Sequence, residues 1–299
     1  MNHFDDMHVD LPTLYATVVA GPQSIKKPRF VLFNRIRYAL RGAMLISKLH
    51  RKLVYSNITT GWMDEFSRFW RHRLDGRPID VVDFQYLRLA YRSRFQHVEH
   101  TDETSSDAYI DAWQQDANLY LLFGAVWTQA KDGNMSFHKA LSYLPHSGAI
   151  LEYGAGAAPI TTGLLKYFGH RKYQFTIADI LQISFVYALD QVGAHVEHLL
   201  LTPFENQIKK KEALAAIFCM TVMEHLPNPL EVVRSFHNSL KPNGLLFFDY
   251  IMADGEGLDA RGAVDQRDAT IKFLGEHFKI LKGSLRTDAS MDFTVAQKN

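Results

Sequence analysis

Residues 151–159 read Leu151-Glu152-Tyr153-Gly154-Ala155-Gly156-Ala157-Ala158-Pro159, and this stretch decides the fold. The apolar run that ends in it predicts a buried strand, and Pro159, with its fixed φ, suits the first position of a helix. Gly154 and Gly156 permit a tight turn in which backbone approaches a ligand with no Cβ in the way. The stretch therefore predicts a strand, a glycine turn and a helix. Taken alone, such a turn also fits a purely structural connection.

Short apolar runs alternate with helical segments from this stretch to the end of the chain. The runs are residues 149–153, 173–178, 195–201, 215–220, 245–250, 278–282 and 293–296. Strands that alternate with helices indicate βαβ units and a parallel sheet. The last two runs leave no room for a helix between them and predict an antiparallel hairpin. We therefore predict an α/β fold with a Rossmann-like, seven-stranded, mostly parallel sheet and a C-terminal antiparallel hairpin.

Residues before this region show helical periodicity instead. Apolar residues recur at three- to five-residue steps over 28–55, and further helices are predicted over 62–74, 81–96 and 106–131. Ser105 and Ser106 suit an N-cap, and Lys131-Asp132-Gly133-Asn134 ends the last helix. The chain is thus expected to divide into an α-helical cap over 1–146, which would bind substrate, and a Rossmann-like domain over 147–299.

Composition places the protein among ordinary globular chains. It has 299 residues, of which 47% are hydrophobic and 22% charged, which excludes disordered, collagen-like and coiled-coil classes. The single cysteine, Cys219, excludes an intrachain disulfide and a cysteine-built zinc site. No apolar run reaches the roughly 18 residues of a membrane span, and the acidic first residues do not resemble a secretory signal. We expect no integral membrane segment and a cytoplasmic location.

The segment between Leu11 and Met63 contains no acidic residue. Its basic residues are Lys26, Lys27, Arg29, Arg35, Arg37, Arg41, Lys48, Arg51 and Lys52. The basic helix expected over 28–55 fits a solvated face or a dimer contact, or attraction to an anionic membrane surface or lipid-like substrate. Nucleic-acid binding is disfavoured because the formal net charge is only +1 and no recognised nucleic-acid module is present.

Two acidic residues indicate the charge of the ligand. A dinucleotide fingerprint needs a third glycine where Pro159 stands, and Glu152 brings a negative charge that opposes phosphate. Asp179 follows the second predicted strand, 23 residues after Gly156. There a carboxylate either accepts ribose hydroxyls or caps the next helix. S-adenosylmethionine (SAM) has an ammonium and a sulfonium and no phosphate, so these charges favour it over NAD.

On the strength of these residues, the part of the chain from about residue 145 to residue 299 resembles the class I SAM-dependent methyltransferases. Glu152-x-Gly154-x-Gly156 resembles the first motif of that family and Asp179 its ribose-binding acid. Residues 215–226 are similar to its fourth strand and following loop, and residues 240–250 to its fifth strand with the preceding turn. Ala158 departs from the pattern because it replaces a third glycine.

The resemblance implies SAM as cofactor and a set of residues that bind it. Glu152 would hold the ammonium directly or through water, Asp179 the ribose and Ile180 the adenine. Thr202 would face the adenine amine, and Phe204 would pack on the base. The cofactor-binding residues implied in this way are Glu152, Tyr153, Gly154, Gly156, Asp179, Ile180, Thr202, Phe204, Cys219, Met220 and Thr221.

Methyl transfer from a sulfonium mainly requires alignment of an acceptor and exclusion of water. Glu224 or His225, just after the fourth strand, is expected to take a proton from a hydroxyl or amine acceptor, unless it only caps the loop. No metal is expected, because His97-Val98-Glu99-His100 matches no metal-binding helix. Of the cap aromatics, most are expected to be core and one or two to line the site; they are Tyr86, Tyr91, Tyr109, Trp113, Tyr120 and Trp127.

Three functions remain open on these residues. The main hypothesis is methylation of a small molecule, in specialised metabolism. The second is a SAM-consuming cyclase that forms a small ring such as azetidine-2-carboxylate and releases methylthioadenosine, with Tyr153 and cap aromatics around the folded cation. The third is a non-catalytic protein that retains the fold as a scaffold.

Overall fold

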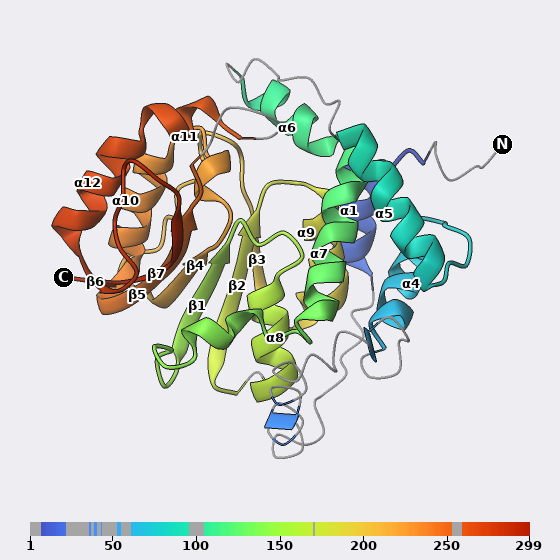
Figure 1. Ribbon diagram of the computed structural model, residues 1–299, viewed down its shortest axis with the longest axis horizontal. Coiled ribbons are helices and arrows are strands. Elements are labelled where there is room, and N and C mark those ends of the chain that lie inside the picture. Colours follow the sequence, from blue (N-terminus) through green and yellow to red (C-terminus); the bar gives the residue numbers. More distant parts are fainter. Residues whose placement is uncertain are drawn as a thin grey trace.

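Seven strands form one sheet in the order β3-β2-β1-β4-β5-β7-β6 (Figure 1). They are β1 (Gly148–Tyr153), β2 (Tyr173–Asp179), β3 (Glu197–Leu200), β4 (Leu214–Cys219), β5 (Leu240–Tyr250), β6 (Phe278–Lys282) and β7 (Met291–Lys298). β1 to β5 pair in parallel, and β7 runs antiparallel to both β5 and β6. The predicted fold class, including the C-terminal antiparallel pair, is confirmed.

The computed structural model describes residues 7–21, 36, 39–40, 43, 53–54, 61–95, 105–169, 171–252 and 259–299. Most of the basic helix predicted over 28–55 therefore lies outside the described residues, as does the histidine-rich window 97–103. The possible dimer or membrane contact of the basic segment stays a prediction. None of the helices in the described part of the chain has the length and apolarity needed to cross a membrane.

Helices cover both faces of the sheet because its strands are apolar on both sides, as is typical of parallel sheets. Successive side chains of β1 point to opposite faces of the sheet. Leu151 packs with α10 (Pro229–Ser239) and α12 (Arg267–His277), and Ile150 packs with α8 (Pro159–Phe168). The short α11 (Arg261–Asp265) precedes α12. Pro159 is the first residue of α8, as the sequence predicts. Helix α8 therefore starts directly beyond the glycine turn.

The N-terminal helices pack together beside the β3 edge of the sheet (Figure 1). They are α1 (Leu11–Ala20), α4 (Trp62–Arg73), α5 (Val81–Phe95) and α7 (Leu119–Lys131), and they share one hydrophobic cluster with α9 (Ile183–Val192). Phe66 lies at its centre, in ring contact with Trp70, Phe84, Phe123 and Tyr187. Arg73 adds a 2.7 Å ion pair to Asp190 of α9. These contacts hold the helical region against the sheet, and a domain division near residue 147 stays a prediction.

The single helix predicted over 106–131 is two helices. α6 (Ser106–Gln114) ends where Gln115 adopts an extended conformation, and a 3-10 turn (Asp116–Asn118) precedes α7. The Asn118 side chain donates a 2.6 Å hydrogen bond to the Ala112 carbonyl, which closes the break. This interruption turns α6 away from α7 and places it above the carboxyl ends of the strands (Figure 1).

Ser105 is the N-cap of α6, as expected, and accepts a 3.2 Å hydrogen bond from the Ala108 amide. Ser105→Ala is expected to lower the free energy of unfolding by about 1 kcal/mol, because that amide loses its acceptor. Urea denaturation followed by circular dichroism measures this change. Ser93→Ala, at an exposed position inside α5, is the matched control and should cost nothing. Equal stability of the two variants would contradict the capping role.

Candidate active site

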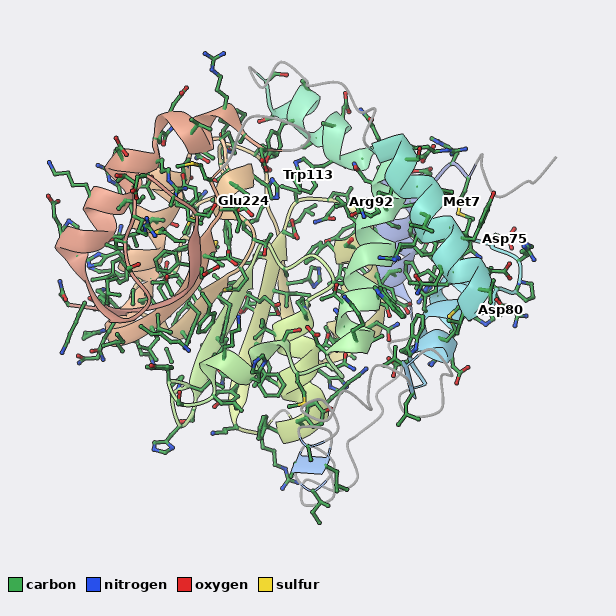
Figure 2. All side chains as sticks on the ribbon, in the orientation of Figure 1. Met7, Asp75, Asp80, Arg92, Trp113 and Glu224 are labelled. Atoms are coloured by element: carbon green, nitrogen blue, oxygen red, sulfur yellow. The ribbon has the colours of Figure 1, made fainter. Side chains whose placement is uncertain are left out.

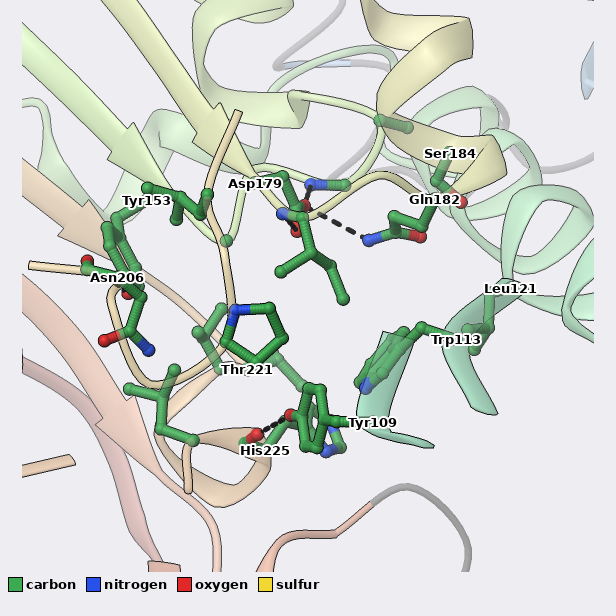
Figure 3. Close-up of a pocket in the computed structure, with 18 of the residues that line it drawn as sticks. Tyr109, Trp113, Leu121, Tyr153, Asp179, Gln182, Ser184, Asn206, Thr221 and His225 are labelled. Carbon is green, nitrogen blue, oxygen red and sulfur yellow. Dashed lines mark hydrogen bonds between the residues drawn. The ribbon is translucent and has the colours of Figure 1, made fainter. Parts of the chain in front are cut away.

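A cavity of about 920 Å³, open mouth included, lies at the carboxyl ends of the parallel strands (Figure 3). Its wall comes from the turn after β1, the end of β2, the segments after β3 and β4, and helices α6, α7 and α9. In parallel α/β sheets ligands bind at this edge.

The glycine turn after β1 forms one wall. Gly154 and Gly156 have φ of 63° and 50°, a region that favours glycine. A Cβ on Gly154 would lie 2.3 Å from a methyl carbon of Val222, so this glycine allows close packing of the loop after β4. A Cβ on Gly156 would meet nothing within 4 Å. Gly156 is therefore the point where bare backbone borders open space in the cavity.

Glu152 lies behind this turn and does not line the cavity. Its side chain is buried, and its two oxygens accept hydrogen bonds from the Ile160 and Thr161 amides at 3.0 and 2.8 Å. Burial raises the pKa of Glu152 to about 7. The first amides of α8 need hydrogen-bond acceptors, and the Glu152 carboxylate provides them. Glu152 is therefore not in the cavity wall, where the sequence placed it. Its negative charge remains one layer below the cavity.

Asp179 lines the cavity at the end of β2. Its Oδ2 accepts from the Gly156 amide at 2.6 Å and from Nε2 of Gln182 at 3.1 Å, and its Oδ1 accepts from the Ile180 amide at 2.7 Å. Burial raises its pKa to about 6. Helix α9 begins at Ile183 with Gln182 as N-cap, so the helix-capping alternative for Asp179 is wrong. A carboxylate accepts about four hydrogen bonds, which leaves Oδ1 room for one more donor.

The loop after β4 supplies Thr221, Val222 and His225 to the cavity. His225 ends the 3-10 turn Met223–His225, and its Nδ1 lies 3.2 Å from Oδ1 of Asp259. The edge of its ring faces Trp113, with ring centroids 5.4 Å apart. Thr221, at φ 57°, donates its amide to Asp249 at 2.5 Å. This loop therefore brings one titratable ring to the cavity.

Three residues expected to bind the cofactor or to take a proton do not line the cavity: Cys219, Met220 and Glu224. Cys219 is fully buried in the core on the α10 side of the sheet. Glu224 is also buried, and burial raises the pKa of its carboxyl group. Figure 2 shows Glu224 and Trp113 above the carboxyl ends of the strands. Of the two proton acceptors considered, only His225 lines the cavity.

The segment after β3 places Leu201, Pro203 and Asn206 in the wall, and not the expected Thr202 and Phe204. Thr202 is exposed and bridges to Glu205, a tight turn that directs neighbouring side chains to opposite sides. Asn206 is buried, and its Nδ2 donates to Oδ1 of Asn228 at 3.0 Å. Its own Oδ1 has no partner among the described residues. Asn206 thus lies in the cavity wall and carries a buried oxygen without a described partner, a feature that no sequence signal indicated.

Helix α6 forms the roof of the cavity through three side chains. Ser106 donates to the Pro203 carbonyl at 3.0 Å, Gln114 to the Leu181 carbonyl at 3.0 Å, and the Tyr109 hydroxyl to the His225 carbonyl. These carbonyls belong to the loops after β3, β2 and β4. Tyr109 and Trp113 line the cavity, as expected for one or two cap aromatics (Figure 3). Tyr91 and Trp127 are core, whereas Tyr86 is exposed.

The structure thus gathers nine of the residues singled out from the sequence around one cavity: Tyr109, Trp113, Tyr153, Gly154, Gly156, Asp179, Ile180, Thr221 and His225. Sequence reasoning missed Leu121, Ala125, Gln182, Ser184 and Asn206. Ser184 and Asn206 each carry a buried oxygen without a partner in the described part of the chain. Within the same part no group of three or more His, Cys, Asp or Glu residues is arranged to hold a metal.

Curated relatives match the chain over short stretches. The ubiquinone biosynthesis O-methyltransferase of Histophilus somni is 30% identical over 130 residues, 42% of this chain and 50% of that protein. The protein of the same name from Klebsiella pneumoniae is 32% identical over 79 residues, 26% of this chain and 32% of that protein. The chain therefore spans about half or less of the length of these relatives.

Solved structures match parts of the chain at low identity. A SAM-dependent methyltransferase from Aquifex aeolicus matches 66% of this chain and all of its own, with 15% identity and a TM-score of 0.41. The N-methyltransferase NodS from Bradyrhizobium japonicum, solved with S-adenosylhomocysteine, matches 57% of this chain and 87% of its own, with 14% identity and a TM-score of 0.42.

A family model described as a methyltransferase domain matches residues 127–280, just over half of the chain. The matched region contains the loops after β1, β2, β3 and β4, which build most of the cavity wall. The protein therefore belongs to this methyltransferase-domain family.

Proposed function

We propose that this protein transfers the methyl group of SAM to a hydroxyl group of a small organic molecule. Family membership supports the reaction class, and the corner between Gly156 and Asp179 carries the cofactor assignment. There a buried carboxylate faces a cavity beside bare backbone and retains room for one further donor. A ribose hydroxyl is such a donor. The non-catalytic alternative gains no support from this corner, since a scaffold needs no charged group buried at a cavity wall.

The residues at the cavity fit SAM in charge as well as in hydrogen bonding. No Lys or Arg is among the described residues of its wall, which disfavours a pyrophosphate ligand. Asp179 at the wall supplies negative charge for a cationic ligand. Ile180 offers an apolar surface for the adenine ring.

Bound SAM supplies a methyl group that is already activated by the positive sulfur. The protein therefore has to orient the acceptor, exclude water and remove a proton. Tyr109 and Trp113 cover the cavity and exclude water. His225 accepts the proton of the acceptor hydroxyl, because an imidazole is a competent base near neutral pH.

The hydroxyl acceptor is proposed on two grounds. The curated relatives described above are named as O-methyltransferases. A neutral hydroxyl must lose its proton on methylation, and His225 lies at the cavity to receive it. The aromatic and apolar residues around His225 (Tyr109, Trp113, Leu226 and Pro227) suit an uncharged, flat acceptor. A role in small-molecule biosynthesis is part of this proposal.

SAM affinity is expected to fall about eightfold between pH 6.5 and pH 5. The pKa of Asp179, raised to about 6 by burial, lies inside this window, so lower pH protonates the carboxylate and removes its attraction for the cation. The SAM ammonium stays protonated throughout, and the window lies below the pKa of about 7 for Glu152. Calorimetric titration at four pH values measures the slope. Asp179→Asn is the control and should bind weakly without this slope.

Calorimetry with SAM, followed by product analysis, tests the proposed function. Binding, together with S-adenosylhomocysteine that forms only when a hydroxylated acceptor such as catechol is added, supports methyl transfer. Methylthioadenosine formed from SAM alone would instead identify the cyclisation reaction. Absence of binding at millimolar SAM would leave only a scaffold role. A panel that pairs each phenol with its carboxylated analogue tests the preference for uncharged acceptors.

A further inference from the structure

Asp259 lies beside His225 although 34 residues separate them in the chain. Oδ1 of Asp259 is 3.2 Å from Nδ1 of His225, and both side chains are about three quarters buried. Asp259 does not line the cavity, whereas His225 does. The carboxylate therefore touches the ring from behind the cavity wall.

Backbone contacts hold Asp259 in this place. The amide of Ala260, the next residue, donates a 2.8 Å hydrogen bond to the Glu224 carbonyl. Gly262 packs so closely on Pro227 that a Cβ would lie 2.0 Å from the Pro227 carbonyl oxygen. Nε2 of Gln266 donates to the same oxygen at 3.3 Å. The segment around the start of α11 therefore contacts the residues just before and just after His225, Glu224 and Pro227.

The opposite side of His225 is held by α6. The Trp113 ring meets the imidazole edge at an interplanar angle of 79°, and the Tyr109 hydroxyl donates to the His225 carbonyl. These two contacts restrict the ring plane and the backbone of His225. With Asp259 on Nδ1, the imidazole is held from two distant parts of the chain.

We propose that Asp259 is the positioning residue of His225 and fixes the tautomer that carries its proton on Nδ1. This inference rests on the proposed function. An ionised carboxylate only accepts hydrogen bonds, so the ring nitrogen that faces it must be the donor. The basic lone pair of the neutral ring then lies on Nε2, which takes the acceptor's hydroxyl proton. The resulting imidazolium is paired with the Asp259 carboxylate.

Other charged groups act on the same ring. Asp179 interacts electrostatically with His225 from the end of β2, and Glu224 does so from the adjacent position. The residues of α6 that contact the ring, Tyr109 and Trp113, are uncharged. Removal of Asp259 therefore leaves two carboxylates that favour a positive ring, but it removes the carboxylate that faces Nδ1 and selects the tautomer. The tautomer of His225 is therefore the property that distinguishes the effect of Asp259 from the effects of Asp179 and Glu224.

Nitrogen-15 NMR of the full chain, with histidine labelled and His225 assigned from the His225→Gln spectrum, tests the proposal at pH 8. The Nδ1-protonated tautomer is expected to dominate in the wild type, and Asp259→Ala, which leaves no acceptor beside Nδ1, is expected to reduce its excess at least tenfold. Asp265→Ala is the matched control, because Asp265 is an exposed carboxylate of α11 that faces Arg261. It should leave the His225 signals unchanged.

Two outcomes would overturn the inference. A wild-type His225 protonated on Nε2 would do so without any variant, and an unchanged tautomer in a folded Asp259→Ala protein would do so as well. SAM binding measured on the same samples separates this result from the proposed function. Binding with the wrong tautomer refutes only the role of Asp259, whereas the right tautomer without SAM binding refutes the proposed function.

Discussion

Replacement of His225 with glutamine is expected to lower turnover by roughly 100- to 10,000-fold, the usual contribution of a positioned general base. His225 is the titratable ring at the cavity, and glutamine retains hydrogen bonding without basicity at neutral pH. SAM affinity should change little, because the cofactor corner at Asp179 and Gly156 is untouched. The measurement is the rate of S-adenosylhomocysteine formation with a saturating hydroxylated acceptor, beside calorimetry with SAM.

His146→Gln is the control for this variant, because His146 is exposed and lies just before β1, at the other end of the sheet. Glu224→Gln separates the two residues considered from the sequence. Glu224 is buried and outside the cavity wall, so its variant is expected to retain most of the turnover. Full activity in His225→Gln together with loss in Glu224→Gln would assign the base to Glu224 and contradict the proposed mechanism.

Asp179→Ala is expected to weaken SAM binding by about 1 to 3 kcal/mol, which corresponds to roughly 5- to 150-fold in Kd. The variant loses the hydrogen bond proposed to the ribose and the negative charge that faces the cation. It also removes the acceptor for the Gly156 amide, so the glycine turn loses one of its anchors. Calorimetry or equilibrium dialysis with SAM measures the change.

Asp111→Ala is the matched control, because Asp111 is an exposed acid of the roof helix α6 that does not line the cavity. It should bind SAM like the wild type. Circular dichroism checks that Asp179→Ala remains folded, since a misfolded variant would lose binding for another reason. Unchanged SAM affinity in a folded Asp179→Ala protein would remove the ribose assignment.

Local patterns in the sequence were sufficient for the sheet and for part of the site. The alternation of apolar runs and helical segments predicted the strands and the C-terminal antiparallel pair, because strand and helix periodicities are properties of neighbouring residues. Gly154, Gly156 and Asp179 were found for a related reason. In parallel sheets the functional loops follow the strands, so the ends of predicted strands mark the edge where a cavity forms.

The sequence could not predict which of several possible hydrogen-bond partners a polar side chain takes. Glu152 was expected at the ligand, but the unsatisfied amides of α8 take both of its oxygens. The break between α6 and α7 likewise depends on a side-chain hydrogen bond of Asn118. In each case the residue had two possible partners, and only the folded geometry selects one.

The sequence by itself determined the sheet, the glycine turn and the acid at the end of β2, because these features depend on residues close together in the chain. Tertiary structure alone decided what surrounds them: Trp113 from α6, Asn206 from the segment after β3, and Asp259 behind His225. These side chains meet because distant loops pack on one edge of the sheet. Local sequence periodicity cannot predict such contacts, because they arise from the burial of surfaces that are remote in sequence.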